Sequence, residues 1–193
     1  MSQTHNFIEF YENDVYYGRA LNSIDDLKTY LEDKLFIAVG GGIGSGKSYF
    51  VDNVIKKIVG DMLTFDVDAM NREMSDGVYK AELTGKAITK MRSGLDNALK
   101  GNQSFIYSGT NSSYLVLSKR LQTAKENNFT TVIIHIDVPF EKAIEQNKGR
   151  ASTGIHPEVP EDKIIKTNKE SKETFEKIKK NRELVDFYFS FKR

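Results

Sequence analysis

A cluster of glycine residues in the sequence ends in Lys47 and Ser48, and it fits the pattern G-x-x-x-x-G-K-[ST] from Gly41 onward. In loops of this pattern, glycines let successive backbone N–H groups turn inward toward phosphate. The lysine then reaches the β- and γ-phosphates, and the serine hydroxyl joins the Mg²⁺ shell. The residues we expect to bind nucleotide are Gly41, Gly42, Ile43, Gly44, Ser45, Gly46, Lys47, Ser48 and Tyr49.

The position of this loop matters because the pattern also occurs by chance in glycine-rich turns that bind nothing. Here it lies between the apolar segment 35–39, which predicts a strand, and a predicted helix that starts at Gly46. The partial positive charge of a helix N-terminus adds to the attraction for phosphate. The context therefore favours a nucleotide site. Kinases, GTPases, motors and ATP-binding modules all share such a site, so residues at the other strand ends must distinguish them.

Two carboxylates follow the second predicted strand, in the segment FDVDAMNRE. A carboxylate at this edge can accept the proton of an attacking hydroxyl, as phosphoryl transfer requires. Strand alternation predicts that Asp66 and Asp68 share one side, so one could hold a metal-bound water while the other acts as base. The alternative is that Asp68 caps the following helix. Arg72, one turn further on, either meets an anionic acceptor or is solvated.

Two further segments carry polar residues to the same edge. Thr110 and Asn111 follow the third predicted strand in the turn GTN, where they could orient an acceptor or simply form the turn. A later loop holds Lys148, Arg150 and His156 before a long helix. Such a loop can fold over the transferring phosphoryl group and stabilise its charge, although a solvated basic loop would have the same sequence.

Short apolar segments predict the strands that position these residues. They are 35–39, 62–67, 104–108, 131–138 and 185–191. Apolar residues recur at helical spacing between them, and Pro160 opens a long helix. Alternating strands and helices predict an α/β fold with a parallel sheet of about five strands between two helical layers. We interpret His135, inside the fourth strand, as a hydrogen-bonded core histidine rather than a ligand.

The first 34 residues precede this alternation. Residues 6–18 predict two short strands around a turn, and Ser23 is placed to cap a helix over 23–34. We therefore expect an extension over 1–34 packed on a single globular domain over 35–193. The hairpin is either an extra element at the sheet edge or an arm that binds a protein partner or a second copy of the chain.

The composition sets further limits. The chain has 193 residues, and its 28 Lys and Arg nearly balance 27 Asp and Glu, as in an ordinary globular domain. A net charge of +1 argues against long nucleic acid as substrate, although a terminal nucleotide needs few contacts. The absence of cysteine excludes a thiolate nucleophile and a cysteine zinc site. The sequence shows neither the pattern of a secretory signal peptide nor a run of ~20 apolar residues. We therefore expect a cytoplasmic protein without a membrane span.

Together these motifs resemble the kinase group that contains phage polynucleotide kinase and the zeta toxins. The resemblance covers about 36–178 and includes the phosphate loop, the Asp-x-Asp segment, the GTN turn, DVP after the fourth strand, and N-x-x-R before VP and a helix. It implies a three-layer P-loop kinase fold that uses ATP and Mg²⁺. By this resemblance Asp68 would be the general base, Thr110 and Asn111 would help fix the acceptor, and Arg150 would be the lid arginine.

The chain departs from this group at several positions near the acceptor and the lid. Gly109 stands where polynucleotide kinases have Asp, and Ser108 where zeta toxins have Glu. Gln146 and Pro157 occupy places where arginine is expected. We predict an ATP- and Mg²⁺-dependent phosphotransferase for a hydroxyl of a nucleotide, a nucleic-acid end or a hydroxymethylated base. The alternatives are a zeta toxin-like sugar-nucleotide kinase and, in another class, a nucleotide-binding switch or pseudo-kinase.

Overall fold

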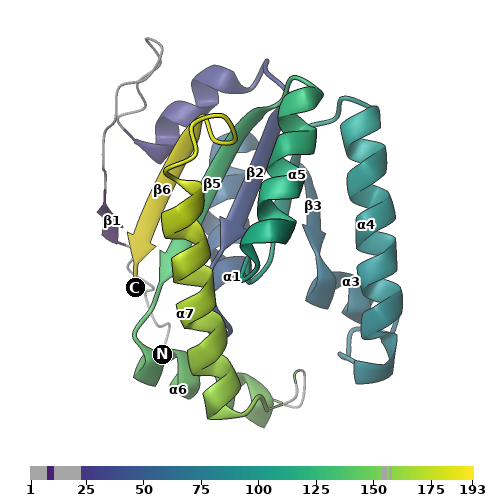
Figure 1. Ribbon diagram of the computed structural model, residues 1–193. Helices are drawn as coiled ribbons and strands as arrows, with labels where there is room; N and C mark the ends of the chain where they lie inside the picture. The colour runs from purple at the N-terminus through teal and green to yellow at the C-terminus, as the bar shows by residue number, and fades with distance from the viewer. Residues whose placement is uncertain (1–7, 11–22, 154–155, 157) are drawn as a thin grey trace.

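The computed structural model describes residues 8–10, 23–153, 156 and 158–193 (Figure 1). Most of the predicted hairpin over 6–18 lies outside these residues, as does Pro157. One strand of that region, β1 (Ile8–Phe10), is described, and it pairs antiparallel with the edge of the sheet. Among the described residues, no helix is both long enough and apolar enough to cross a bilayer.

The centre of the fold is a six-stranded sheet with the order β1-β6-β5-β2-β4-β3. Every pair except β1 with β6 is parallel, so five strands form the predicted parallel sheet. The observed strand ends differ from the predicted ones by at most two residues. The parallel strands are β2 (Leu35–Gly40), β3 (Leu63–Asp66), β4 (Phe105–Ser108), β5 (Thr130–Asp137) and β6 (Phe187–Lys192).

Helices cover both faces of the sheet, which confirms the three-layer prediction (Figure 1). One face packs against α3 (Val67–Glu73), α4 (Thr84–Lys100), α5 (Tyr114–Glu126) and α7 (Glu161–Ile178). The other packs against η1 (Ile24–Tyr30) and against the helical segments α1 (Lys47–Phe50), η2 (Val51–Ile55) and α2 (Lys56–Val59). The short η3 (Ala81–Leu83) precedes α4, and α6 (Phe140–Ser152) follows β5 and contacts α7.

The central strand β2 is buried along its whole length, and its side chains alternate between the two layers. Phe36 and Ala38 belong to the cluster on the α5 and α7 side, whereas Ile37 and Val39 belong to the cluster on the α1 side. This double burial explains the continuous apolar sequence, which is typical of a parallel strand. The same burial fixes the carboxyl end of β2, where the glycine-rich loop begins.

The predicted helix over 23–34 is shorter and tighter than expected. It is the 3₁₀-helix η1, and Ser23 caps it as predicted. The Ser23 side chain accepts a hydrogen bond from Asp25 N at 2.9 Å, and the Asp26 carboxylate accepts one from Ser23 N at 2.9 Å. Ile24 and Leu27 are buried against the sheet, so this segment packs on the core.

His135 lies in the core, as predicted, but its contacts differ from the expected ones. Its ring stacks on Phe175, with centroids 5.0 Å apart. Its Nδ1 has no hydrogen-bond partner among the residues that the structure describes. The pKa of His135 is lowered from 6.5 to about 4, mainly because burial disfavours the imidazolium, an effect that Asp137 opposes and Lys172 and Lys47 reinforce. The histidine is therefore neutral at physiological pH.

This lowered pKa predicts an acid-dependent loss of stability. Between pH 6.5 and pH 4 the unfolded chain binds a proton at His135 that the folded protein does not, so folding weakens as pH falls. We expect the free energy of unfolding to fall by roughly 2–3 kcal/mol more in wild type than in His135→Phe between pH 7 and pH 4.5. Urea unfolding of both proteins measures this, and carboxylates common to both cancel. A stability difference that does not change with pH would contradict the assignment.

Candidate active site

The glycine-rich loop joins the carboxyl end of β2 to α1, and its conformation requires glycine. Gly44 and Gly46 have φ of +77° and +86°, in the left-handed region. A β-carbon at Gly44 would collide with the Ala143 carbonyl of α6, and one at Gly46 would collide with the Arg193 guanidinium. The two glycines therefore serve both the turn and the close approach of neighbouring elements.

Lys47 is bound inside this loop. Its ammonium donates hydrogen bonds to the carbonyl oxygens of Gly41 at 2.8 Å and Gly42 at 2.7 Å. The pKa of Lys47 is lowered to about 8, chiefly by burial, whereas the charges of Asp66 and Asp68 favour the protonated form. A partly desolvated cation beside the inward-turned loop is suited to bind phosphate.

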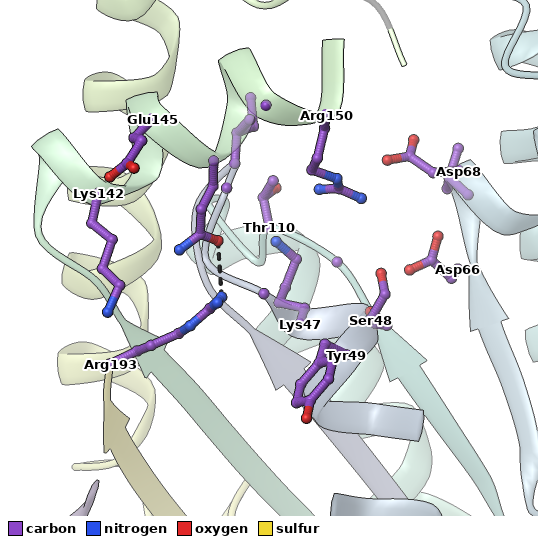
Figure 2. Close-up of a pocket in the computed structure, with 18 of the residues that line it drawn as sticks. Lys47, Ser48, Tyr49, Asp66, Asp68, Thr110, Lys142, Glu145, Arg150 and Arg193 are labelled. Carbon is purple, nitrogen blue, oxygen red and sulfur yellow. Dashed lines mark hydrogen bonds between the residues drawn. The ribbon is translucent and has the colours of Figure 1, made fainter. Parts of the chain in front are cut away.

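A pocket of about 1160 Å³ opens over the loop (Figure 2). Its lining includes most of the predicted site. The predicted residues that line it are Ile43, Gly44, Gly46, Lys47, Ser48, Tyr49, Asp66, Asp68, Thr110 and Arg150. The other predicted residues, which do not line it, are Gly41, Gly42, Ser45, Arg72 and Asn111. Gly41, Gly42 and Ser45 are buried within the loop.

Asp66 and Asp68 both face the pocket, but not because of strand alternation (Figure 2). The strand predicted over 62–67 ends at Asp66, and α3 begins at Val67, so strand alternation does not extend to Asp68. The helix cap also falls on Asp66 rather than Asp68, since Asp66 Oδ1 accepts a hydrogen bond from Ala69 N at 3.0 Å. Asp68 is exposed in the first turn of α3 and is not the cap.

The oxygen groups beside the loop fit Mg²⁺ bound together with a nucleotide. Mg²⁺ in such sites takes one or two carboxylates plus substrate phosphates and waters. The Ser48 hydroxyl and the Asp66 carboxylate lie on the same side of the pocket (Figure 2). Within the described parts of the chain, no group of three acidic or histidine side chains could hold a metal alone. An ion here would therefore depend on the phosphates of the nucleotide.

The prediction that Lys148 and Arg150 lie in a loop is wrong, because both lie in α6; the end of this helix and His156 after it stand in the place of the predicted lid. Arg150 projects from α6 into the pocket (Figure 2). Arg72 does not line the pocket; its Nη1 lies 3.2 Å from His156 Nε2, and Arg150 Nη2 lies 3.5 Å from the same atom. Because arginine can only donate, His156 accepts through Nε2 as a neutral imidazole. Burial and the two arginines lower the pKa of His156, which favours this form. Lys148 instead pairs with Glu161 at 2.8 Å, on the exposed surface.

The turn after β4 presents Thr110 to the pocket but not Asn111. Thr110 Oγ1 lies 3.3 Å from Ser112 Oγ. Asn111, with φ of +50°, packs its side chain against Gly40, where a β-carbon would lie 2.9 Å from Asn111 Nδ2. Asn111 thus holds the turn against β2. The buried Ser108 hydroxyl lines the pocket and has no hydrogen-bond partner among the described residues.

Asn168 on α7 is hydrogen-bonded to the glycine-rich loop. This residue is buried on the inner face of the helix, and its amide also makes hydrogen bonds there. Its Nδ2 donates to the carbonyl oxygens of Ile43 at 3.0 Å and Ile164 at 2.9 Å. A β-carbon at Gly42 would collide with the same amide. A polar residue at helical spacing from the buried Ile164 and Phe175 was the sequence signal for this contact.

Several pocket residues were not predicted as site residues. They are Val67, Tyr107, Ser108, Gly109, Lys142, Glu145, Gln146, Gly149 and Arg193. Arg193 is the clearest omission, because it directly follows the last buried parallel strand and so reaches the same sheet edge as Asp66 and Thr110. The general rule that ligands bind beyond the carboxyl ends of parallel strands would have identified it.

Comparison with known proteins agrees with this geometry. The family model described as zeta toxin matches residues 20–191. The comparison with curated proteins found no sequence match.

Solved structures show the same fold at low sequence identity. The AvrRxo1-ORF1:-ORF2 complex with ATP has a TM-score of 0.63 and 16% identity, covering 86% of this chain and 58% of that one. The PezAT toxin-antitoxin structure from Streptococcus pneumoniae has a TM-score of 0.63 and 16% identity, and the match covers 89% of this chain and 79% of that one. The Pnkp1/Rnl/Hen1 RNA repair complex has a TM-score of 0.60 and 22% identity, and the match covers 75% of this chain and 46% of that one. This chain therefore spans less than two thirds of the matched chain in the first and third of these.

The lowered pKa of Lys47 predicts how phosphate binding depends on pH. Free protein loses the Lys47 proton as pH rises through about 8, whereas adjacent phosphates would keep the ammonium charged. Above pH 8, binding of phosphate then requires Lys47 to take up a proton. The affinity for ADP is therefore highest below pH 8 and falls as pH rises above it. We expect the Kd for ADP to rise about tenfold between pH 7.5 and pH 9.5, measured by calorimetry. In Lys47→Ala, ADP should bind more weakly and without this slope. A flat wild-type profile would contradict the prediction.

Proposed function

Because the chain belongs to the zeta toxin family of P-loop kinases, we propose that it transfers the γ-phosphoryl group of ATP to a hydroxyl group of a nucleotide-containing acceptor. The observation that carries this proposal is the meeting of Lys47 and Asp68 in one pocket, with Arg150 above them. A phosphate-binding cation and an exposed carboxylate in one pocket are the parts that phosphoryl transfer needs.

In the proposed reaction the loop holds the donor. Backbone N–H groups of the loop and the start of α1 bind the α- and β-phosphates, and the Lys47 ammonium exchanges its carbonyl partners for β- and γ-phosphate oxygens. Mg²⁺, held with Ser48 and Asp66, would neutralise charge on those phosphates. Arg150 on the lid then offsets the charge that develops on the transferring group.

Asp68 acts on the acceptor. Its carboxylate accepts the proton of the acceptor hydroxyl as the new O–P bond forms and the bond from the γ-phosphorus to ADP breaks. Asp68 suits this role better than Asp66, because Asp66 already accepts a hydrogen bond from Ala69 N whereas Asp68 is exposed to the pocket. Thr110 lies where it could orient the acceptor. Arg72 and Asn111 would act indirectly, through His156 and Gly40.

The acceptor class is a separate proposal. The polynucleotide kinase resemblance suggests a nucleotide, a nucleic-acid end or a hydroxymethylated base. The zeta toxin match over 20–191 favours a second candidate, a sugar nucleotide, which is the acceptor class that the resemblance to zeta toxins implies. The net charge of +1 makes long nucleic acid the weakest candidate.

We also propose that residues 1–34 are an extension of a single kinase domain over 35–193. The pairing of β1 with β6 supports an edge position for part of it. Two of the similar structures contain a second protein, ORF2 in one and the antitoxin of a toxin-antitoxin system in the other. A protein partner or a second copy bound at this edge is therefore the alternative role.

Replacing the proposed base tests the mechanism directly. We expect Asp68→Asn to bind ATP as wild type does while kcat for phosphoryl transfer falls by about 10³-fold. The assay follows labelled ATP with a panel of nucleosides, oligonucleotide ends, hydroxymethylated DNA and sugar nucleotides. Glu73→Gln is the matched control, since this exposed residue of the same helix pairs with Lys90 at 3.3 Å outside the pocket. Transfer by Asp68→Asn within twofold of wild type would reject Asp68 as the base.

The same panel separates the candidate functions. Transfer to a sugar nucleotide, with growth arrest on expression that Asp68→Asn relieves, would support the toxin-like activity. Transfer to oligonucleotide ends or hydroxymethylated DNA would support the polynucleotide kinase-like activity. Tight ATP binding by wild type without transfer to any acceptor would instead identify a nucleotide-binding switch or pseudo-kinase.

A further inference from the structure

Arg193 enters the phosphate pocket from an element that the proposed mechanism does not use. It directly follows β6, and its backbone N–H donates to the Asp137 carbonyl at 3.0 Å, at the end of β5. This bond fixes the backbone of Arg193 at the carboxyl edge of the sheet. From there the side chain points toward the loop, on the side of Lys47 away from Asp66 and Asp68 (Figure 2).

A glutamine on the lid helix holds the guanidinium in place. Arg193 Nη1 donates to Gln146 Oε1 on α6 at 2.8 Å. Gln146 is the position where the resemblance to related kinases leads us to expect an arginine. In this chain the residue after β6, rather than α6, supplies a guanidinium to that place, and Gln146 supplies the acceptor that orients it.

The guanidinium also lies against the start of α1. A β-carbon at Gly46 would collide with Arg193 Nη1, so the two residues are in direct contact. Gly46 is the N-cap of the helix that carries Lys47 and Ser48. The backbone N–H groups at this helix end point toward α- and β-phosphates in loops of this type. Arg193 therefore borders the part of the loop that receives the inner phosphates, while Asp66 and Asp68 border the γ-phosphate end.

We propose that Arg193 binds the α- and β-phosphates of the donor nucleotide and that Gln146 is the residue that positions its guanidinium. This inference rests on the proposed nucleotide-dependent function. A guanidinium can contact two phosphate oxygens at once through its planar fork, and its charge persists at every physiological pH. Lys142 and Glu145 lie on the same side of the pocket, with opposite charges, so Arg193 supplies the net positive charge there (Figure 2).

Calorimetric titration with ADP tests the proposal. Arg193→Gln should raise the Kd for ADP by about tenfold to a hundredfold, because a charged contact to phosphate is lost. Binding of adenosine, which has no phosphate, should not change. Arg193→Lys keeps the charge but not the fork, so an intermediate loss is expected. Gln146→Ala keeps the guanidinium but removes the acceptor that orients it, and should raise the Kd about threefold.

Exchanging the two partners, so that the guanidinium comes from α6, provides a rescue. The double variant Arg193→Gln/Gln146→Arg places the arginine on α6 and should recover ADP affinity to within about threefold of wild type. Lys177→Gln is the charge-matched control, since this exposed lysine of α7 lies outside the pocket. Thermal unfolding of each variant checks that the fold is intact. A purely structural role for Arg193 would lower the melting temperature and leave ADP affinity unchanged.

The outcomes separate this inference from the proposed function. If a folded Arg193→Gln protein binds ADP within twofold of wild type, while Lys47→Ala loses binding, Arg193 has no role in phosphate binding and the nucleotide site stands. If affinity falls in Arg193→Gln but the double variant does not recover it, the role of Gln146 is overturned. If wild type binds neither ADP nor ATP, the proposed function itself fails.

Discussion

The arrangement of the pocket depends on one partly desolvated cation, the Lys47 ammonium. Carbonyl oxygens of Gly41 and Gly42 accept hydrogen bonds from it within the loop, and burial lowers the pKa of the ammonium. The carboxylates of Asp66 and Asp68 offset that effect, which is why the charged form persists at neutral pH. Phosphate oxygens can replace the carbonyls because they offer the ammonium the same kind of acceptor with a full negative charge.

A loop that exchanges these partners must be held by its surroundings, because it contains few side chains of its own. The loop emerges from β2, which is buried on both faces. The Asn168 amide binds the Ile43 carbonyl from α7, and the Ala143 carbonyl of α6 closes on Gly44. Three separate elements, β2, α6 and α7, therefore fix the conformation of the glycine-rich loop. Such preorganisation lowers the entropic cost of binding a ligand. The glycines are needed for these approaches as well as for the turn.

Local patterns predicted the elements well and their long-range contacts poorly. Buried parallel strands read as continuous apolar runs, so the sheet and the phosphate loop could be located from the sequence. The start of α3 was misplaced because an apolar residue, Val67, continues the β3 pattern while Asp66 already caps the helix. The pairing of Arg72 with His156 and that of Arg193 with Gln146 join distant segments, and no spacing rule encodes such contacts.

The two ends of the pocket differ in how they are built. At the donor end, the glycine loop and the Arg193 guanidinium are tied to neighbouring backbone and to Gln146. At the acceptor end, Ser108 and Gly109 stand where related kinases have carboxylates. A β-carbon at Gly109 would lie only 2.7 Å from the Tyr107 hydroxyl, so a larger residue could not enter without displacing that ring. With no carboxylate at these two positions, Lys47 and Arg150 leave a more positive potential around Asp68 than a kinase with such a carboxylate would have.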